Sequence, residues 1–207
     1  MVKNDIELVF FTRWFPYNKS KEYSFIMPEL EILSKKFKSI TIVPQEVKDD
    51  QFKINLNVKI DCSLSHDLKK SSLSQYFLTI FNSKFAIEIF KVRANFRKTQ
   101  LAFSRLLCAN IVNDWILNFK KNKSSEKIVF YSFWIDYTTL GATLNKENIV
   151  ISRAHNYDLY GTPNLNYYVP FLDTILTNLN LVFPDSFFGK DYIKSNFQKS
   201  KCKVGIM

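Results

Sequence analysis

Short apolar runs alternate with amphipathic stretches along this chain of 207 residues, and that alternation limits the folds it can adopt. Residues 6–12 (IELVFFT) have the pattern of a buried strand, and residues 39–43 (SITIV) follow as a second strand ended by Pro44. Between them, apolar side chains three to four residues apart predict an amphipathic helix with Pro28 in its first turn: Phe25, Ile26, Leu30, Leu33 and Phe37. Further strands are predicted at residues 57–60, 127–131, 148–152 and 179–183. Apolar strands that alternate with helices predict an α/β fold with a doubly wound, mostly parallel sheet.

Helical periodicity dominates residues 73 to 119. One apolar stripe there comprises Leu73, Tyr76, Phe77, Ile80, Phe81 and Phe85, and a second comprises Ile111, Val112, Trp115, Ile116 and Phe119. A short helix is predicted around residues 137–144, another begins near Ser186, and residues 201–206 begin a last apolar element. Ligands of such sheets bind outside the carboxyl ends of the strands, which directs attention to the loops at residues 12–25, 132–137 and 152–170.

Glycine is scarce, and this excludes two classes of nucleotide-binding protein. The four glycines are at positions 141, 161, 189 and 205, so neither GxGxxG nor GxxxxGK[ST] occurs. Both motifs need glycine because backbone N–H groups must approach a phosphate closely. We therefore expect no bound dinucleotide and no other cofactor. No cluster of His, Cys, Asp or Glu has the spacing of a metal site, and the sequence has no apolar run of 18 residues. Residues 1–11 lack the pattern of a signal peptide, so none is expected.

The net charge of +10 indicates an anionic partner. Residues 84–127 contain ten Lys and Arg against Glu88, Asp114 and Glu126, a net +7. Two interpretations stay open for this segment: an anionic membrane surface, or ordinary helices with solvated basic faces. No helix-turn-helix, RNP-like or zinc-finger pattern accompanies the charge, so nucleic acid is not the expected partner.

The densest group of reactive side chains follows a predicted strand, in residues 152–160 (SRAHNYDLY). This block offers a fixed cation, an imidazole, a carboxylate and a phenol: Arg153, His155, Asp158 and Tyr160. Asp158 and His155 could instead cap a helix and satisfy the backbone, and Arg153 could pair either with Asp158 or with a phosphate of a ligand.

Two other loops carry candidate ligand-binding side chains. The loop after the first strand contains Arg13, Trp14, Tyr17 and Glu22, in which aromatic faces suit sugar rings. Trp14 could equally fasten the loop to the core. Trp134 and Asp136 follow another strand, where a core indole and a helix cap are the favoured alternatives to a role in the site.

Several segments of the chain resemble family 4 glycosyltransferases of the bacterial capsule, O-antigen and colanic-acid types. The resemblance rests on IVISRAHNYDLY with the following NYYVPFLDTILTNLNLVFPDS, on FFTRWFPYNKSKEYSFIMPELEILSKKFKSITIVPQ and on FYSFW at residues 130–134. Residues 45–120 match only in general character. The first loop departs from the family pattern, since residues 18–21 (NKSK) stand where glycine is usual.

The resemblance implies a Rossmann-like domain, the N-terminal and acceptor-binding half of a two-domain GT-B enzyme. It implies a retaining transfer from a nucleotide-sugar donor to a saccharide or lipid-linked acceptor, in the cytoplasm at the inner face of the membrane. Residues 1–203 would form this domain and residues 204–207 would begin the linker to a donor domain that lies outside the 207 residues, so the chain alone would be inactive. His155 would be the catalytic-site residue, with an acceptor-binding set of Arg13, Trp14, Tyr17, Glu22, Trp134, Arg153, Asp158 and Tyr160. The competing hypothesis is a saccharide- or lipid-binding α/β module without turnover.

Overall fold

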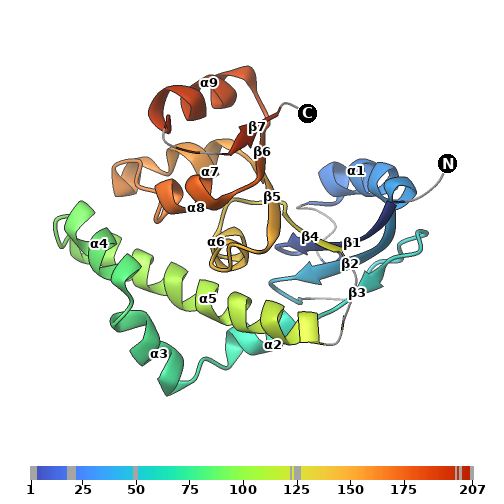
Figure 1. The fold of residues 1–207 in the computed structure, drawn as a ribbon, viewed down its shortest axis with the longest axis horizontal. Helices are drawn as coiled ribbons and strands as arrows, with labels where there is room; N and C mark the ends of the chain where they lie inside the picture. The colour runs from blue at the N-terminus through green and yellow to red at the C-terminus, as the bar shows by residue number, and fades with distance from the viewer. Residues whose placement is uncertain are drawn as a thin grey trace.

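A computed structural model describes residues 4–17, 22–48, 51–121, 123, 127–198, 200 and 202–205. Within these residues seven strands form one parallel sheet in the order β3-β2-β1-β4-β5-β6-β7 (Figure 1). The strands are β1 (Asn4–Thr12), β2 (Phe37–Pro44), β3 (Lys59–Ile60), β4 (Lys127–Ser132), β5 (Ile149–Ala154), β6 (Leu181–Pro184) and β7 (Lys203–Val204). The prediction of a doubly wound parallel sheet is confirmed. Val204 still pairs with β6, and residues 206–207 of the expected linker lie outside the described part of the chain.

Helices cover both faces of the sheet. They are α1 (Tyr23–Lys36), α2 (Ser63–Lys69), α3 (Leu73–Ile80), α4 (Ser83–Lys91), α5 (Phe96–Lys121), α6 (Tyr137–Thr143), α7 (Asn156–Tyr160), α8 (Leu172–Asn178) and α9 (Phe187–Asn196), with a 3-10 turn, η1, at Pro163–Leu165. Alternate residues of β1 supply two separate cores, because successive side chains of a strand point to opposite faces. Leu8 and Phe10 pack with α1, whereas Val9 and Phe11 pack with α5 and α6.

The helical region between residues 73 and 119 differs from the prediction in two ways. It forms three helices, interrupted at Phe81–Asn82 and again after α4, where Arg93 and Ala94 adopt positive φ angles of 52° and 53°. The first predicted stripe also faces solvent along α3, since Leu73, Phe77 and Phe81 are exposed. Periodicity shows that residues share one face of a helix, but it does not show which face meets the protein.

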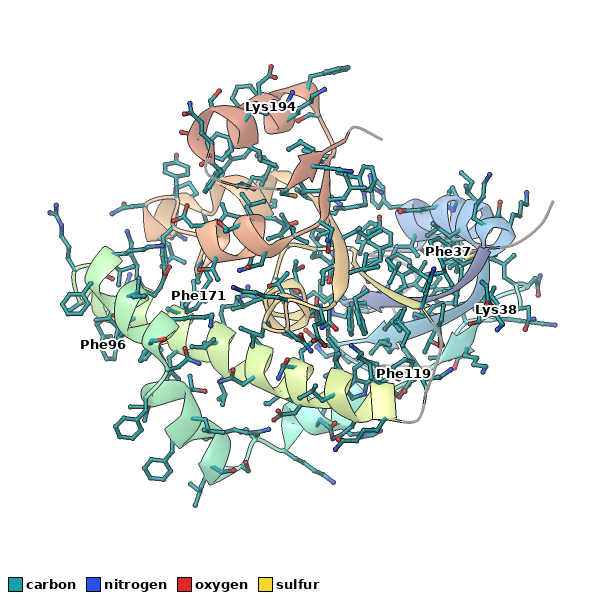
Figure 2. The ribbon with its side chains drawn as sticks, in the orientation of Figure 1. Phe37, Lys38, Phe96, Phe119, Phe171 and Lys194 are labelled. Carbon is teal, nitrogen blue, oxygen red and sulfur yellow. The ribbon has the colours of Figure 1, made fainter. Side chains whose placement is uncertain are left out.

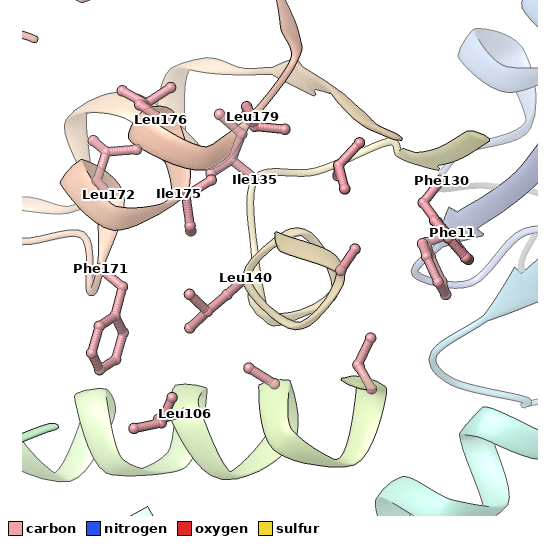
Figure 3. Packing of buried hydrophobic residues seen from close by; sticks show 14 of the residues in the cluster. Phe11, Leu106, Phe130, Ile135, Leu140, Phe171, Leu172, Ile175, Leu176 and Leu179 are labelled. Carbon is pink, nitrogen blue, oxygen red and sulfur yellow. The ribbon is translucent and has the colours of Figure 1, made fainter. Parts of the chain in front are cut away.

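A close approach between α5 and α6 holds one side of the molecule together. Six of the seven residues of α6 are buried, and Leu140 points into the space bordered by Leu106, Phe171 and Ile175 (Figure 3). A Cβ atom added to Gly141 would lie 2.5 Å from the carbonyl oxygen of Ala109 on α5. The absence of a side chain at position 141 therefore sets how closely the two helices pack.

Gly141→Ala should destabilise the fold by about 1–3 kcal/mol, because backbone atoms of α5 would have to move. Gly189→Ala on α9 is the matched control, since its new Cβ would meet its nearest atom, Cβ of Pro184, at 3.0 Å. Urea denaturation of both variants measures the difference. Equal stabilities for the two variants would contradict this account of the α5–α6 contact.

Candidate functional site

The candidate site lies where the direction of the strand order reverses. The chain runs from β1 outward to β2 and β3 on one side, and β4 to β7 continue on the other side of β1. Adjacent loops therefore leave the carboxyl ends of β1 and β4 in opposite directions and open a crevice between them. The β1 loop carries Arg13 and Trp14, and the β4 loop carries Trp134 and Asp136.

The carboxylate of Glu22 fastens these two loops to each other. Its side chain lies at the start of α1 and is buried, with a residue exposure of 1%. One oxygen accepts the backbone N–H groups of Trp14 (2.7 Å) and Phe15 (2.9 Å). The other accepts the backbone N–H of Arg13 (3.2 Å) and the indole N–H of Trp134. Four donors thus converge on one buried carboxylate, so Glu22 acts as a positioning residue rather than a surface contact.

His155 joins this arrangement through Trp134. The imidazole and indole ring centroids are 4.2 Å apart, and the ring of Phe133 lies 4.9 Å away on the same imidazole. Nδ1 of His155 lies 3.2 Å from Oδ2 of Asp158. Nε2 has no hydrogen-bond partner among the described residues, and 18% of the side chain is exposed. An imidazole held at Nδ1 by a carboxylate presents Nε2 to a ligand as an acceptor when the ring is neutral.

Asp158 also performs the capping role that the sequence left open. Its Oδ2 accepts the backbone N–H of His155 (3.1 Å) and that of Ile135 (3.3 Å), so the carboxylate links the start of α7 to the β4 loop. Burial raises the pKa of Asp158, and the hydrogen bonds and charge of His155 act in the opposite direction.

A groove of about 420 Å³ opens over the carboxyl ends of β1, β4 and β5. The described residues that line it come from three loops and from α5, α6 and α7. They include Arg13, Trp14, Leu101, Arg105, Trp134, Asp136, Tyr137, Tyr157, Asp158 and Tyr168. His155 itself is not part of this lining, although its two partners Trp134 and Asp158 are. Of the nine predicted site residues, four line the groove: Arg13, Trp14, Trp134 and Asp158. A fifth, His155, contacts two of these four, Trp134 and Asp158.

Arg105 and Tyr137 are groove residues that the sequence did not single out. The Arg105 guanidinium lies over the Tyr137 ring at 5.6 Å from the centroid, and it has no ion pair within the described ranges. Arg105 belongs to the basic segment 84–127, but only the folded position of α5 brings it to the carboxyl ends of the strands. A fixed cation without a carboxylate partner suits an anionic or polyhydroxylated ligand.

Arg153 points to the α1 side of the sheet, where its guanidinium and the imidazole of His155 contact the same Phe133 ring. Of the two alternatives stated for Arg153, the pairing with Asp158 does not form. The Arg153 guanidinium lies 3.1 Å from the carboxylate of Glu29 on α1, and it lies over the ring of Phe133 at 5.2 Å. The hydroxyl of Tyr131 donates to the same carboxylate. Arg153 and Asp158 separate because the first lies on β5 and the second on α7 beyond the end of that strand. Arg153 therefore stabilises the α1 face.

Tyr17 and Tyr160 also lie outside the groove lining. The Tyr17 hydroxyl is 3.0 Å from Sγ of Cys62, and burial together with that neighbour raises the pKa of Tyr17 to about 12. The ring of Tyr160 packs against Tyr192 of α9 at 4.6 Å between centroids. Residues 18–21 of the first loop lie outside the described residues.

The remaining predicted side chains at the crevice are held by local contacts. Asp136 caps α6 through the backbone N–H of Thr138 (2.8 Å) and accepts a hydrogen bond from Gln45 (2.7 Å). The indole of Trp14 donates to Glu46 (3.3 Å), and the Arg13 guanidinium lies 4.7 Å from the centre of the Trp14 ring. Trp14 thus fastens its loop to the segment after β2 and also lines the groove.

Comparisons with known proteins leave the family open. The chain matches no model of a known protein family, and it matches no curated protein sequence. Among the described residues, no group of three or more His, Cys, Asp or Glu side chains has the geometry to hold a metal ion. No described helix combines the length and apolar character needed to cross a bilayer.

Glu22→Gln should cost about 1–3 kcal/mol in the free energy of unfolding, because its NH2 group would face N–H donors in place of an accepting oxygen. Glu31→Gln on the exposed side of α1 is the control, with an expected change within about 0.5 kcal/mol. Urea denaturation followed by tryptophan fluorescence measures both. Similar midpoints for the two variants would show that the loops do not depend on this carboxylate.

Proposed function

We propose that the groove binds a saccharide and that the chain is the acceptor-binding domain of a retaining, family 4-like glycosyltransferase. The observation that carries the proposal is that two indoles and a cation line one groove at the carboxyl ends of β1, β4 and β5, with an imidazole packed against one of the indoles. Sugar rings pack their C–H faces on aromatic side chains, while their hydroxyls take hydrogen bonds from polar groups at the rim.

The proposal gives each side chain a defined task. Trp134 and Trp14 supply apolar faces whose orientation is fixed, since the loops that carry them share the Glu22 carboxylate. Nε2 of His155 accepts a hydrogen bond from a sugar hydroxyl, and Asp158 keeps the imidazole in place. Arg105 contacts a phosphate or carboxylate on the acceptor. Ordered polar groups of this kind promote transfer by orienting the acceptor toward the donor sugar.

The resemblance of residues 149–160 to the SRAH block of family 4 glycosyltransferases supports the transferase part of the proposal. In that family the nucleotide sugar is held by a second domain, so the proposal assigns the acceptor side of a cytoplasmic reaction to these residues. The acceptor is a saccharide, free or lipid-linked, of a bacterial surface polysaccharide. The chain is expected to bind the acceptor without turning over a nucleotide sugar by itself.

Binding can be tested on an array of oligosaccharides from bacterial capsules and O-antigens, followed by a fluorescence titration with the oligosaccharide retained. His155→Ala and Arg105→Gln should each raise the dissociation constant about fivefold or more, since each removes a polar contact of about 1 kcal/mol. Phe25→Ala, an exposed position on α1, is the control and should leave the constant unchanged. Binding by both variants at the wild-type affinity would contradict the assignment of the groove.

Transfer can be separated from binding in the organism that encodes the chain. Replacing the gene by its His155→Ala variant should remove or shorten a surface polysaccharide on an electrophoresis gel, whereas the Phe25→Ala variant should not. A polysaccharide of normal length and amount in the His155→Ala strain would reduce the proposal to a saccharide-binding module.

A further inference from the structure

A large apolar surface lies at the end of the molecule farthest from the sheet. Eight side chains of α3, the α3–α4 connection, α4 and the start of α5 have exposures between 51% and 83%. We refer to them as the α3–α4 surface: Leu73, Phe77, Leu78, Ile80, Phe81, Ile87, Phe90 and Phe96. Figure 1 shows α3 and α4 outside α5, and Figure 2 shows Phe96 at the outer edge of the molecule. Exposed apolar groups gathered in this way mark an interaction site.

The helices that carry this surface are firmly attached to α5. Helix α3 begins with a capping box between Ser72 and Gln75, and its buried residue Thr79 accepts a hydrogen bond from Asn110 of α5 (3.0 Å). Helix α4 packs Phe85 against Phe103 of α5, with 5.5 Å between ring centroids. Helix α3 thus turns a threonine toward the protein and phenylalanines toward solvent, the reverse of an ordinary amphipathic helix in a soluble domain.

A second attachment comes from the loop that borders the groove. The buried carboxylate of Glu88 on α4 accepts hydrogen bonds from the Tyr168 hydroxyl (2.8 Å) and from the backbone N–H of Phe171 (3.1 Å). The apolar side chains are therefore exposed on a fixed scaffold.

Positive charge surrounds the same surface. Residues 69–98 contain seven Lys and Arg against one acid, the buried Glu88, which gives a net +6. Lys91 pairs with Glu88 and Asp173, whereas Lys84, Arg93 and Arg97 have no ion pair with any described residue. The occupant of this surface must therefore accept phenylalanine side chains and carry negative charge.

We infer that the α3–α4 surface docks the protein on a bilayer that contains anionic lipids. A bilayer places acyl chains directly below a layer of anionic headgroups, so it accepts the phenylalanines and the cations of one helical face together. A second copy of the chain fits less well, because a two-fold interface would set the same positive charge on both sides. This inference does not depend on the proposed saccharide site.

The docking surface does not coincide with the basic segment 84–127 of the sequence. Helix α5 has 26 residues and is roughly 39 Å long at about 1.5 Å per residue. Lys120 and Lys121 are at its far end, where Lys120 donates to Asn148, and Lys127 opens β4. Only the first part of that segment, together with α3, belongs to the α3–α4 surface.

Vesicle sedimentation of the 207-residue chain tests the inference, with vesicles of phosphatidylcholine alone and of phosphatidylcholine mixed with phosphatidylglycerol. The wild type should sediment with the mixed vesicles and remain in the supernatant with phosphatidylcholine. The pair Phe77→Ser and Phe81→Ser should weaken binding about tenfold or more, and so should the pair Lys84→Glu and Arg97→Glu. The charge reversals lie in the first turns of α4 and α5, where an acidic residue favours the helix.

Matched controls use exposed side chains of the same type on other elements. Phe187→Ser with Phe188→Ser alters two phenylalanines of α9 that are each 72% exposed, and Lys194→Glu with Lys203→Glu reverses two charges elsewhere. Both controls should bind mixed vesicles as the wild type does, and thermal melting should show that all variants are folded.

Three outcomes would overturn the inference. The first is equal recovery of the wild type in the supernatant with both kinds of vesicle, and the second is equal loss of binding in the α3 pair and the α9 control. The third is a wild-type dimer in light scattering that Phe77→Ser with Phe81→Ser converts to a monomer without any vesicle binding. That result would assign the surface to a second copy of the chain.

Discussion

The candidate site depends on one buried carboxylate. Three successive backbone N–H groups follow β1, and the indole N–H of Trp134 approaches from the β4 loop; all four donate to Glu22. Buried N–H groups without an acceptor would each carry a desolvation cost, so one side chain that accepts from both loops stabilises them in these positions. The position of the imidazole of His155 follows, since it packs on that indole.

Topology explains why such a contact forms at all. Residues 22 and 134 are far apart in the sequence, but β1 and β4 are neighbours at the point where the strand order reverses. The loops that leave these two strands therefore share one crevice. The opposite ends of the same strands, at Asn4 and Lys127, lie one strand length away from these loops.

The sequence predicted the sheet well because its strands are short apolar runs bounded by polar segments. It also located the carboxyl ends of β1, β4 and β5 correctly, and with them Arg13, Trp14, Trp134 and Asp158. It could not identify Glu22 as the common acceptor, because this requires knowing which donors of two distant loops meet. Arg105 was missed since helical periodicity does not show where along the sheet a helix crosses. The sequence did not offer Glu29 as a partner of Arg153, because Glu29 lies on α1 and is distant in sequence from β5.

The two sides of the groove differ in how tightly they pack against the core, and α6 forms the tightly packed side. Gly141 and its neighbours touch α5 so closely that little can change along that side without disturbing the core. Tyr157 and Leu165, on the opposite rim, stand on short segments with few core contacts. Under the proposed binding role, related chains that take different ligands should therefore differ at the rim and agree along α6, so that a change of ligand comes from substitutions at the rim.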